Sequence, residues 1–175
     1  MRIFFLFFFV FNLNAQQSYI DYISPYHPTI SNSGMVVSQN NLSSDIGIEI
    51  LNKGGNAVDA AVAVGFSLAV TLPRAGNLGG GGFMLVYLKE KDEIFYIDYR
   101  SKSPLNASID NIFNLNGKNI SPIDFSDDMY DKTRYGYKAP AIPGTVAGLL
   151  EAHEKFGSLP LETVLAPAIR QANQG

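Results

Sequence analysis

The sequence contains no cysteine among its 175 residues. Disulfide bonds, thiolate nucleophiles and cysteine-ligated metal sites are therefore all excluded. Stability must come from packing, and the chain is long enough for one domain with a hydrophobic core. Its apolar fraction of 46% is that of a globular chain rather than a disordered one.

An excess of positive charge is also missing, since 13 basic residues stand against 16 acidic ones and the formal net charge is −3. A nucleic-acid partner needs a basic patch, so we expect none. Histidine is scarce as well. The two that are present, His27 and His153, lie far apart in the sequence and beside no acidic cluster, so we expect packing or solvated histidines and no metal or cofactor.

No hydrophobic run is long enough to span a membrane. The longest such run, Ile3–Phe11, is about half of the roughly 20 residues that a transmembrane helix needs. It follows the basic Arg2 and precedes the small Ala15, which is typical of a secretory signal peptide. We therefore expect a signal peptide at 1–15 and an exported protein, periplasmic or secreted. The alternative is an uncleaved N-terminal anchor.

Residues 16–33 follow this signal without a clear period and read as an N-terminal extension of the mature chain. The apolar side chains of Leu42, Ile46 and Ile50 then recur at a spacing of four, which predicts an amphipathic helix. Asn40, Asn41 and Ser43 are its candidate caps, and Gly54-Gly55 closes it.

A second helix is predicted over 57–70, where the sequence AVDAAVAVGFSLAV is apolar nearly all round. Such a helix is buried on several sides. Asn56 and Asp59 form a capping arrangement at its start, and Pro73 is expected to end it.

Two β-type runs, FMLVYL at 83–88 and IFYIDYR at 94–100, are separated by a charged turn and predict an antiparallel hairpin. Both runs are apolar on both faces, so the sheet should be covered on both sides. Two strands alone make a marginal sheet, and further strands would have to come from elsewhere.

The segment 105–135 is rich in Asn, Asp and Ser and predicts a long surface excursion, with Phe113, Phe125 and Met129 as isolated anchors. A Pro-Gly turn at 143–144 then opens a helix that ends at Gly157. One side of this helix carries a stripe of Val146, Leu149, Leu150 and His153. A last helix follows toward the C-terminus. The order of elements indicates an α/β fold in which helices cover a sheet.

The glycine-rich loop at 76–82 has the composition of a phosphate-binding turn but the wrong context. Phosphate-binding loops leave a strand and open a helix, whereas this loop leaves a helix and enters a strand. We interpret it as a tight passage where backbones pack closely.

Three stretches together resemble the large-subunit region of the gamma-glutamyltransferase family, also called glutathione hydrolases. They are GGNAVDAAVAVGFSLAVTLPRAGNLGGGGFMLV at 54–86, IDYRSKSP at 97–104 and PGTVAGL at 143–149. The resemblance extends over 34–175 and identifies this segment as part of that subunit. It implies one part, incomplete in this chain, of a four-layer αββα sandwich of the N-terminal-nucleophile hydrolases.

The resemblance also implies a chemistry. In this family a precursor cuts itself and exposes a threonine at the start of a small subunit. The threonine attacks a gamma-glutamyl amide such as glutathione and passes the glutamyl group to water or an amine, and its own α-amine serves as the base. The small subunit of the same precursor is thus the implied partner. The threonine and the oxyanion-hole glycines lie beyond the matched region, so we expect no catalytic residue here and no turnover by the 175-residue chain alone.

The family's arginine for the glutamyl α-carboxylate falls on Arg100, the one substrate-binding residue that we predict. A guanidinium can hold a carboxylate through two parallel hydrogen bonds. Without the resemblance, an arginine that closes a strand reads as a surface ion-pair partner. The family usually has an acidic residue directly after this arginine, and Ser101 stands there instead.

Three other functions remain open at this point. One is a secreted module that binds glutamyl groups without chemistry, and another is a decayed remnant that does not fold unaided. The third is a related acylase that acts on a different amide, toward which Ser101 is a hint. Ser33, Ser67, Thr71 and Thr145 lie in no recognised nucleophile motif.

Overall fold

The computed structural model describes residues 30–113 and 127–174. The chain divides into two units, Met1–Ser33 and Gly34–Gly175, and the helices and strands described below lie in the second. The predicted signal peptide and most of the predicted N-terminal extension fall outside the described residues. Within the described part, no helix is both long and apolar enough to cross a membrane.

Helix α1 (Asn41–Asn52) confirms the first predicted helix. Asn40 caps it, because the Asn40 side chain accepts a hydrogen bond from the Leu42 backbone N–H at 2.9 Å. Ile46 and Ile50 are buried as predicted, whereas Leu42 at the start of the expected stripe is 60% exposed.

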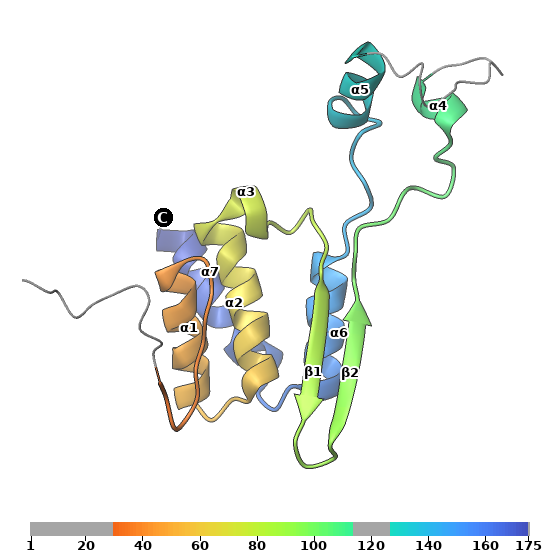
Figure 1. The fold of residues 1–175 in the computed structure, drawn as a ribbon. Coiled ribbons are helices and arrows are strands. Elements are labelled where there is room, and N and C mark those ends of the chain that lie inside the picture. The colour runs from red at the N-terminus through yellow and green to blue at the C-terminus, as the bar shows by residue number, and fades with distance from the viewer. Residues whose placement is uncertain (1–29, 114–126, 175) are drawn as a thin grey trace, which may run out of the picture. The chain divides into compact units, whose positions relative to one another are not determined.

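Helix α2 (Ala57–Thr71) is the centre of the helical layer. Asn56 and Asp59 form a capping box, in which each side chain accepts a hydrogen bond from the other residue's backbone N–H. Val62 and Ala63 are fully buried, as the all-round apolar sequence predicts. Helices α1 and α7 pack on it, and Figure 1 shows the three side by side.

The prediction that Pro73 ends helix α2 is confirmed, and the structure adds a second role for this proline. Helix α2 ends at Thr71, and Pro73 begins the four-residue helix α3 (Pro73–Gly76) instead of only stopping the previous one. The physical reason is that proline suits the first position of a helix, where its missing N–H is not required.

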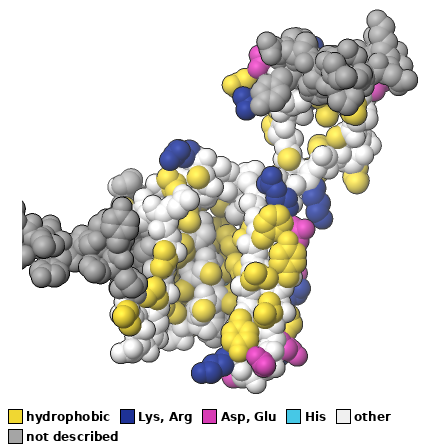
Figure 2. All heavy atoms as spheres, viewed as in Figure 1, with side chains coloured by type: hydrophobic (Ala, Val, Ile, Leu, Met, Phe, Trp, Pro, Cys, Tyr) yellow, Lys and Arg dark blue, Asp and Glu magenta, His cyan; other side chains and the backbone are white. Residues whose placement is uncertain are grey.

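Strands β1 (Phe83–Leu88) and β2 (Glu93–Asp98) form the predicted antiparallel hairpin, in which Leu85 lies opposite Tyr96. One face packs inward, with Val86 and Ile97 buried. The other face is exposed, and Figure 2 shows hydrophobic side chains gathered over it. These side chains are Phe83, Leu85, Tyr87, Ile94 and Tyr96.

The expected coverage on both faces is therefore wrong for the described part of the chain. Apolar residues on both faces predict burial on both faces, yet the described helices cover one face only. Helix α6 (Thr145–Phe156) contacts β2 and lies behind the hairpin in Figure 1.

Helix α6 ends at Gly157 as predicted, with Leu149 buried and Val146 partly exposed. Helix α7 (Leu161–Gln174) follows and contains Pro167, which is buried. The segment predicted as a surface excursion carries two short helices, α4 (Ile109–Phe113) and α5 (Asp127–Arg134). Its Phe113 is buried, Phe125 falls outside the described residues, and the Met129 side chain is not described.

Candidate functional site

Arg100 lies just beyond the end of β2, on the first turn after the strand. The Asp98 side chain shapes this turn, since its Oδ1 accepts the Arg100 backbone N–H at 2.9 Å. The guanidinium is exposed, and its Nη1 donates to the Ser101 Oγ at 3.3 Å. Ser101 thus stands as a neutral neighbour of the cation, where the family usually has a carboxylate.

The glycine-rich loop packs directly against this turn. Gly82 and Tyr99 exchange both backbone hydrogen bonds, at 3.3 and 3.1 Å. A Cβ atom on Gly81 would lie 2.7 Å from the Tyr99 carbonyl oxygen and would overlap the Ser101 nitrogen. No side chain fits there, so the interpretation of the loop as a tight passage between backbones is confirmed.

The start of α6 closes on the same turn from the other side. The N–H groups of Gly144 and Thr145 donate to the Gly80 carbonyl at 2.8 and 3.2 Å. Lys102 and Ile142 form an isolated antiparallel bridge, with hydrogen bonds of 3.1 and 2.8 Å. Backbone hydrogen bonds therefore join the loop, the strand end and the helix start.

A hollow of about 210 Å³ lies over this junction. Figure 2 shows Lys and Arg side chains gathered where the chain leaves the hairpin. Neither Arg100 nor Lys102 forms an ion pair with any residue that the structure describes, and Glu151 is already paired with Lys155 at 2.5 Å. The lining consists of Asp98, Tyr99, Arg100, Lys102, Ile142, Pro143, Gly144, Ala147, Gly148 and Glu151.

This arrangement suits the binding of an anion. A guanidinium without an ionic partner, mounted on a turn with little freedom, can hold a carboxylate in one orientation. Burial raises the pKa of Tyr99, so its phenol is neutral at pH 7 and adds no charge. Over the described ranges we find no cluster of His, Asp or Glu arranged to hold a metal ion.

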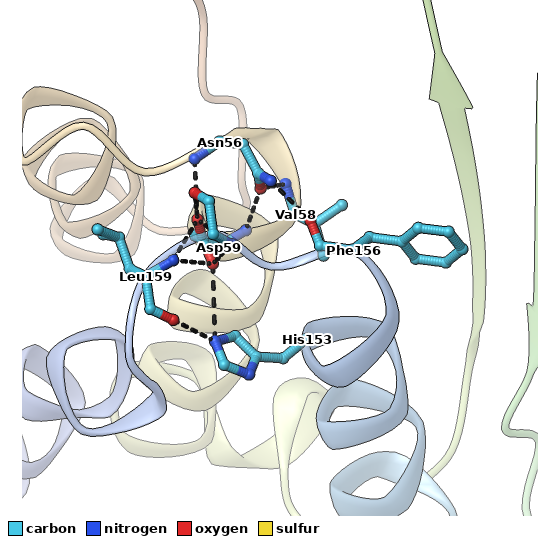
Figure 3. A network of polar contacts seen from close by, with 7 residues as sticks. Asn56, Val58, Asp59, His153, Phe156 and Leu159 are labelled. Atoms are coloured by element: carbon cyan, nitrogen blue, oxygen red, sulfur yellow. Dashed lines mark hydrogen bonds and ion pairs between the residues drawn. The ribbon is translucent and has the colours of Figure 1, made fainter. Parts of the chain in front are cut away.

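A second polar cluster surrounds Asp59, whose side chain is fully buried (Figure 3). Its carboxylate accepts from the Asn56 N–H at 2.9 Å, and from the Ser158 N–H and Oγ at 3.1 and 2.6 Å. The Leu159 N–H lies 3.3 Å away. Burial raises the pKa of Asp59, but these hydrogen bonds outweigh it and hold the pKa below its ordinary value.

His153 also faces this cluster, with Nε2 2.9 Å from the Leu159 carbonyl and 3.7 Å from the Asp59 carboxylate. A catalytic triad would need the histidine to hydrogen-bond the serine, but Ser158 donates to Asp59 instead. The cluster fastens the connection between α6 and α7 onto the start of α2. Sequence reasoning explained Asp59 by capping and missed these partners, because they lie about 100 positions away.

The match to known families decides the wider assignment. The family model described as gamma-glutamyltranspeptidase matches residues 43–175. The chain belongs to the gamma-glutamyltranspeptidase family. This confirms the resemblance drawn from the three motifs, and Arg100 lies within the matched region.

Individual curated proteins that the chain resembles are a glutathione hydrolase and an acylase. The chain is 43% identical over 150 residues to the glutathione hydrolase proenzyme of Escherichia coli strain K12. The aligned region covers 86% of this chain and 24% of that protein. The chain is 38% identical over 156 residues to the acylase ACY 1 proenzyme of Pseudomonas sp. strain V22, covering 89% of this chain and 27% of that one.

The fold agrees as well. The crystal structure of Helicobacter pylori gamma-glutamyltranspeptidase matches with a TM-score of 0.70 and 40% identity, over 85% of this chain and 40% of that one. The chain spans about a quarter of the length of the curated relatives it matches.

Proposed function

We propose that this chain supplies the donor-binding part of a gamma-glutamyltransferase, an enzyme that acts on gamma-glutamyl amides such as glutathione. Arg100 is the observation that carries the proposal. It belongs to a matched motif, lies in a hollow, has no ionic partner among the described residues, and projects from a turn that three backbone segments fix. Its task is to hold the α-carboxylate of the glutamyl group.

The rest of the chemistry follows from the family. A threonine at the start of a small subunit, cut from the same precursor, attacks the γ-carbonyl and forms a γ-glutamyl ester while the amine leaves with a proton. The ester is then cleaved by water or by an acceptor amine. The layers of the small subunit would complete the αββα sandwich, of which the described residues form one helical layer and one hairpin. The word "proenzyme" in the names of the relatives supports a self-processing precursor.

Two arginine variants test the donor-binding role. Arg100→Lys keeps the charge but loses the two-pronged grip, and should weaken binding of glutathione about tenfold or more, as loss of a charge-assisted hydrogen bond does. Arg74→Lys is the matched control, because Arg74 is an exposed arginine on α3 outside the hollow. NMR titration of glutathione into the purified chain measures the affinity of each variant. Equal binding by wild type and Arg100→Lys would contradict the proposal.

The purified chain is also expected to release no glutamate from a gamma-glutamyl amide, since no nucleophile and base are paired in the part of the chain that the structure describes. Measurable release would contradict this arm and leave the binding arm intact. A non-catalytic binding module makes the same prediction, namely glutathione binding without release of glutamate.

A second candidate is an acylase that acts on another side-chain amide. Ser101 in place of the usual acidic residue favours it, and so does the identity to the ACY 1 proenzyme. The two functions differ in whether an α-carboxylate is needed. An acylase whose substrate lacks that group would bind it equally well in wild type and in Arg100→Lys.

A further inference from the structure

The side chain of Tyr99, next to Arg100, is wedged between the hairpin and α6. It is half-buried, and its hydroxyl lies 3.4 Å from the Phe83 carbonyl at the start of β1. Its backbone N–H and carbonyl are both bonded to Gly82. Tyr99 is thus held at both its ring and its backbone.

Gly148 on α6 is what makes room for this ring. Gly148 is buried, and a Cβ atom there would overlap the Cβ, Cγ and Cδ1 atoms of Tyr99. A Cβ on Gly82 would lie 2.7 Å from the Tyr99 ring carbon Cε2. An alanine at position 148 would have to push the tyrosine, because the overlapping atoms belong to the base of its side chain. At position 82 the atoms met are Cε2, Cζ and Oη, at the outer end of the ring.

Arg100 has few constraints of its own by comparison. Its guanidinium is exposed, and its contacts are the Ser101 hydroxyl and the Asp98 carboxylate on its backbone N–H. Tyr99 directly precedes Arg100, so its position helps to set the direction in which Arg100 leaves the strand, together with the Asp98 contact and the Lys102–Ile142 bridge. Displacement of Tyr99 moves the Arg100 backbone, and a shift of about 1 Å in a binding group is enough to lose much of its effect.

We infer that Tyr99, seated against Gly148, is a positioning residue for Arg100, and that the missing side chain at position 148 is required for binding the glutamyl carboxylate. This inference rests on the proposed function. It assigns to the glycine of the PGTVAGL motif a role in aiming a substrate-binding arginine on a different element.

The first test is Gly148→Ala, with NMR titration of glutathione into the purified chain. We expect binding about tenfold weaker, comparable to the loss of a charge-assisted hydrogen bond. Gly65→Ala is the matched control. Gly65 is also a helical glycine, but a Cβ there meets the flexible end of Leu149, 2.8 Å from Cδ1, so it should leave binding unchanged. Equal binding by wild type and Gly148→Ala would overturn the inference.

A double variant separates positioning from general loosening of the fold. In the Tyr99→Gly background the ring is gone, so adding Gly148→Ala should cause no further loss of binding. If the two changes instead lower binding independently, Gly148 does not act through Tyr99 and the inference is wrong.

Substitutions at Tyr99 decide the matter if Gly148→Ala does not fold. Tyr99→Phe keeps the ring against Gly148 and should bind glutathione within about twofold of wild type, because only the long contact to the Phe83 carbonyl is lost. Tyr99→Leu removes the outer ring atoms that lie against Gly82 and should bind about tenfold more weakly. Equal binding by both variants would overturn the inference.

Arg100→Lys in the same assay distinguishes the two claims. If it binds glutathione as well as wild type, the proposed function fails and the inference fails with it. If it loses binding while Gly148→Ala and Tyr99→Leu do not, the inference alone fails.

Discussion

At the scale of single residues, Asp59 is a fully buried carboxylate outside the site. A buried carboxylate is costly unless it is fully hydrogen-bonded, and Asp59 meets that condition through Asn56, Ser158 and Leu159. These partners belong to the start of α2 and to the connection between α6 and α7. One side chain thereby ties the last two helices to the core.

Asp59→Asn should lower the free energy of unfolding by about 2–3 kcal/mol. The amide has one acceptor oxygen, so its NH₂ group would face N–H donors and leave them unsatisfied. Glu49→Gln is the control, because Glu49 pairs with Lys53 and Arg170 at the surface and should cost less than about 1 kcal/mol. Urea denaturation measures both. An equal loss of unfolding free energy in the two variants would show that the Asp59 hydrogen bonds do not stabilise the fold strongly.

The same group predicts a pH dependence. The pKa of Asp59 is lower in the folded protein than in the unfolded chain, where it is about 3.9. The stabilisation is therefore fully present above about pH 4 and is lost as the pH falls through the folded-state pKa. Urea midpoints between pH 7 and pH 2.5 should decline less steeply for Asp59→Asn than for wild type. Parallel declines would contradict this assignment.

At the scale of elements, the hairpin has one buried face and one exposed face although its sequence is apolar on both. Val86 is 7% exposed, whereas its neighbour Leu85 is 72% exposed. Exposed apolar strand residues in such number are unusual and mark a surface that can take a covering layer.

Alanine substitutions on the two faces test this assignment. Val86→Ala should destabilise the chain by about 2 kcal/mol, since it opens a cavity in the core. Leu85→Ala should change stability by less than about 0.5 kcal/mol, because it removes surface that is already exposed. Chemical denaturation of each variant gives the two values. A Leu85→Ala cost equal to that of Val86→Ala would mean that the outer face is buried in solution.

The elements that sequence could predict are those whose causes are local. Asn40 and Asn56 predict helix starts and Gly157 predicts a helix end, because each caps its helix through groups within a few residues. What sequence could not predict depends on distant partners. The exposure of Leu85 depends on which layers surround the hairpin, and the partners of Asp59 lie about 100 positions away. Arg100 was predictable only through its motif, because an arginine at a strand end has no distinctive local signal.

At the scale of the whole molecule, the chain spans about a quarter of the length of its curated relatives. The predicted signal peptide can be tested separately from the rest. Expression in a bacterium with an export pathway should yield a mature protein that begins at Gln16, as measured by mass spectrometry of the intact chain. Recovery of a membrane-bound protein that still begins at Met1 would support the uncleaved-anchor alternative.

The central claim is that Arg100 recognises the α-carboxylate of a glutamyl group, and one measurement tests it most directly. Binding of L-glutamate and of isoglutamine, whose α-carboxylate is an amide, would be compared in wild type and in Arg100→Gln. Wild type should prefer glutamate about tenfold or more, as a charge-assisted hydrogen bond predicts, and the variant should bind both ligands equally weakly. A preference for glutamate that survives in Arg100→Gln would contradict the account.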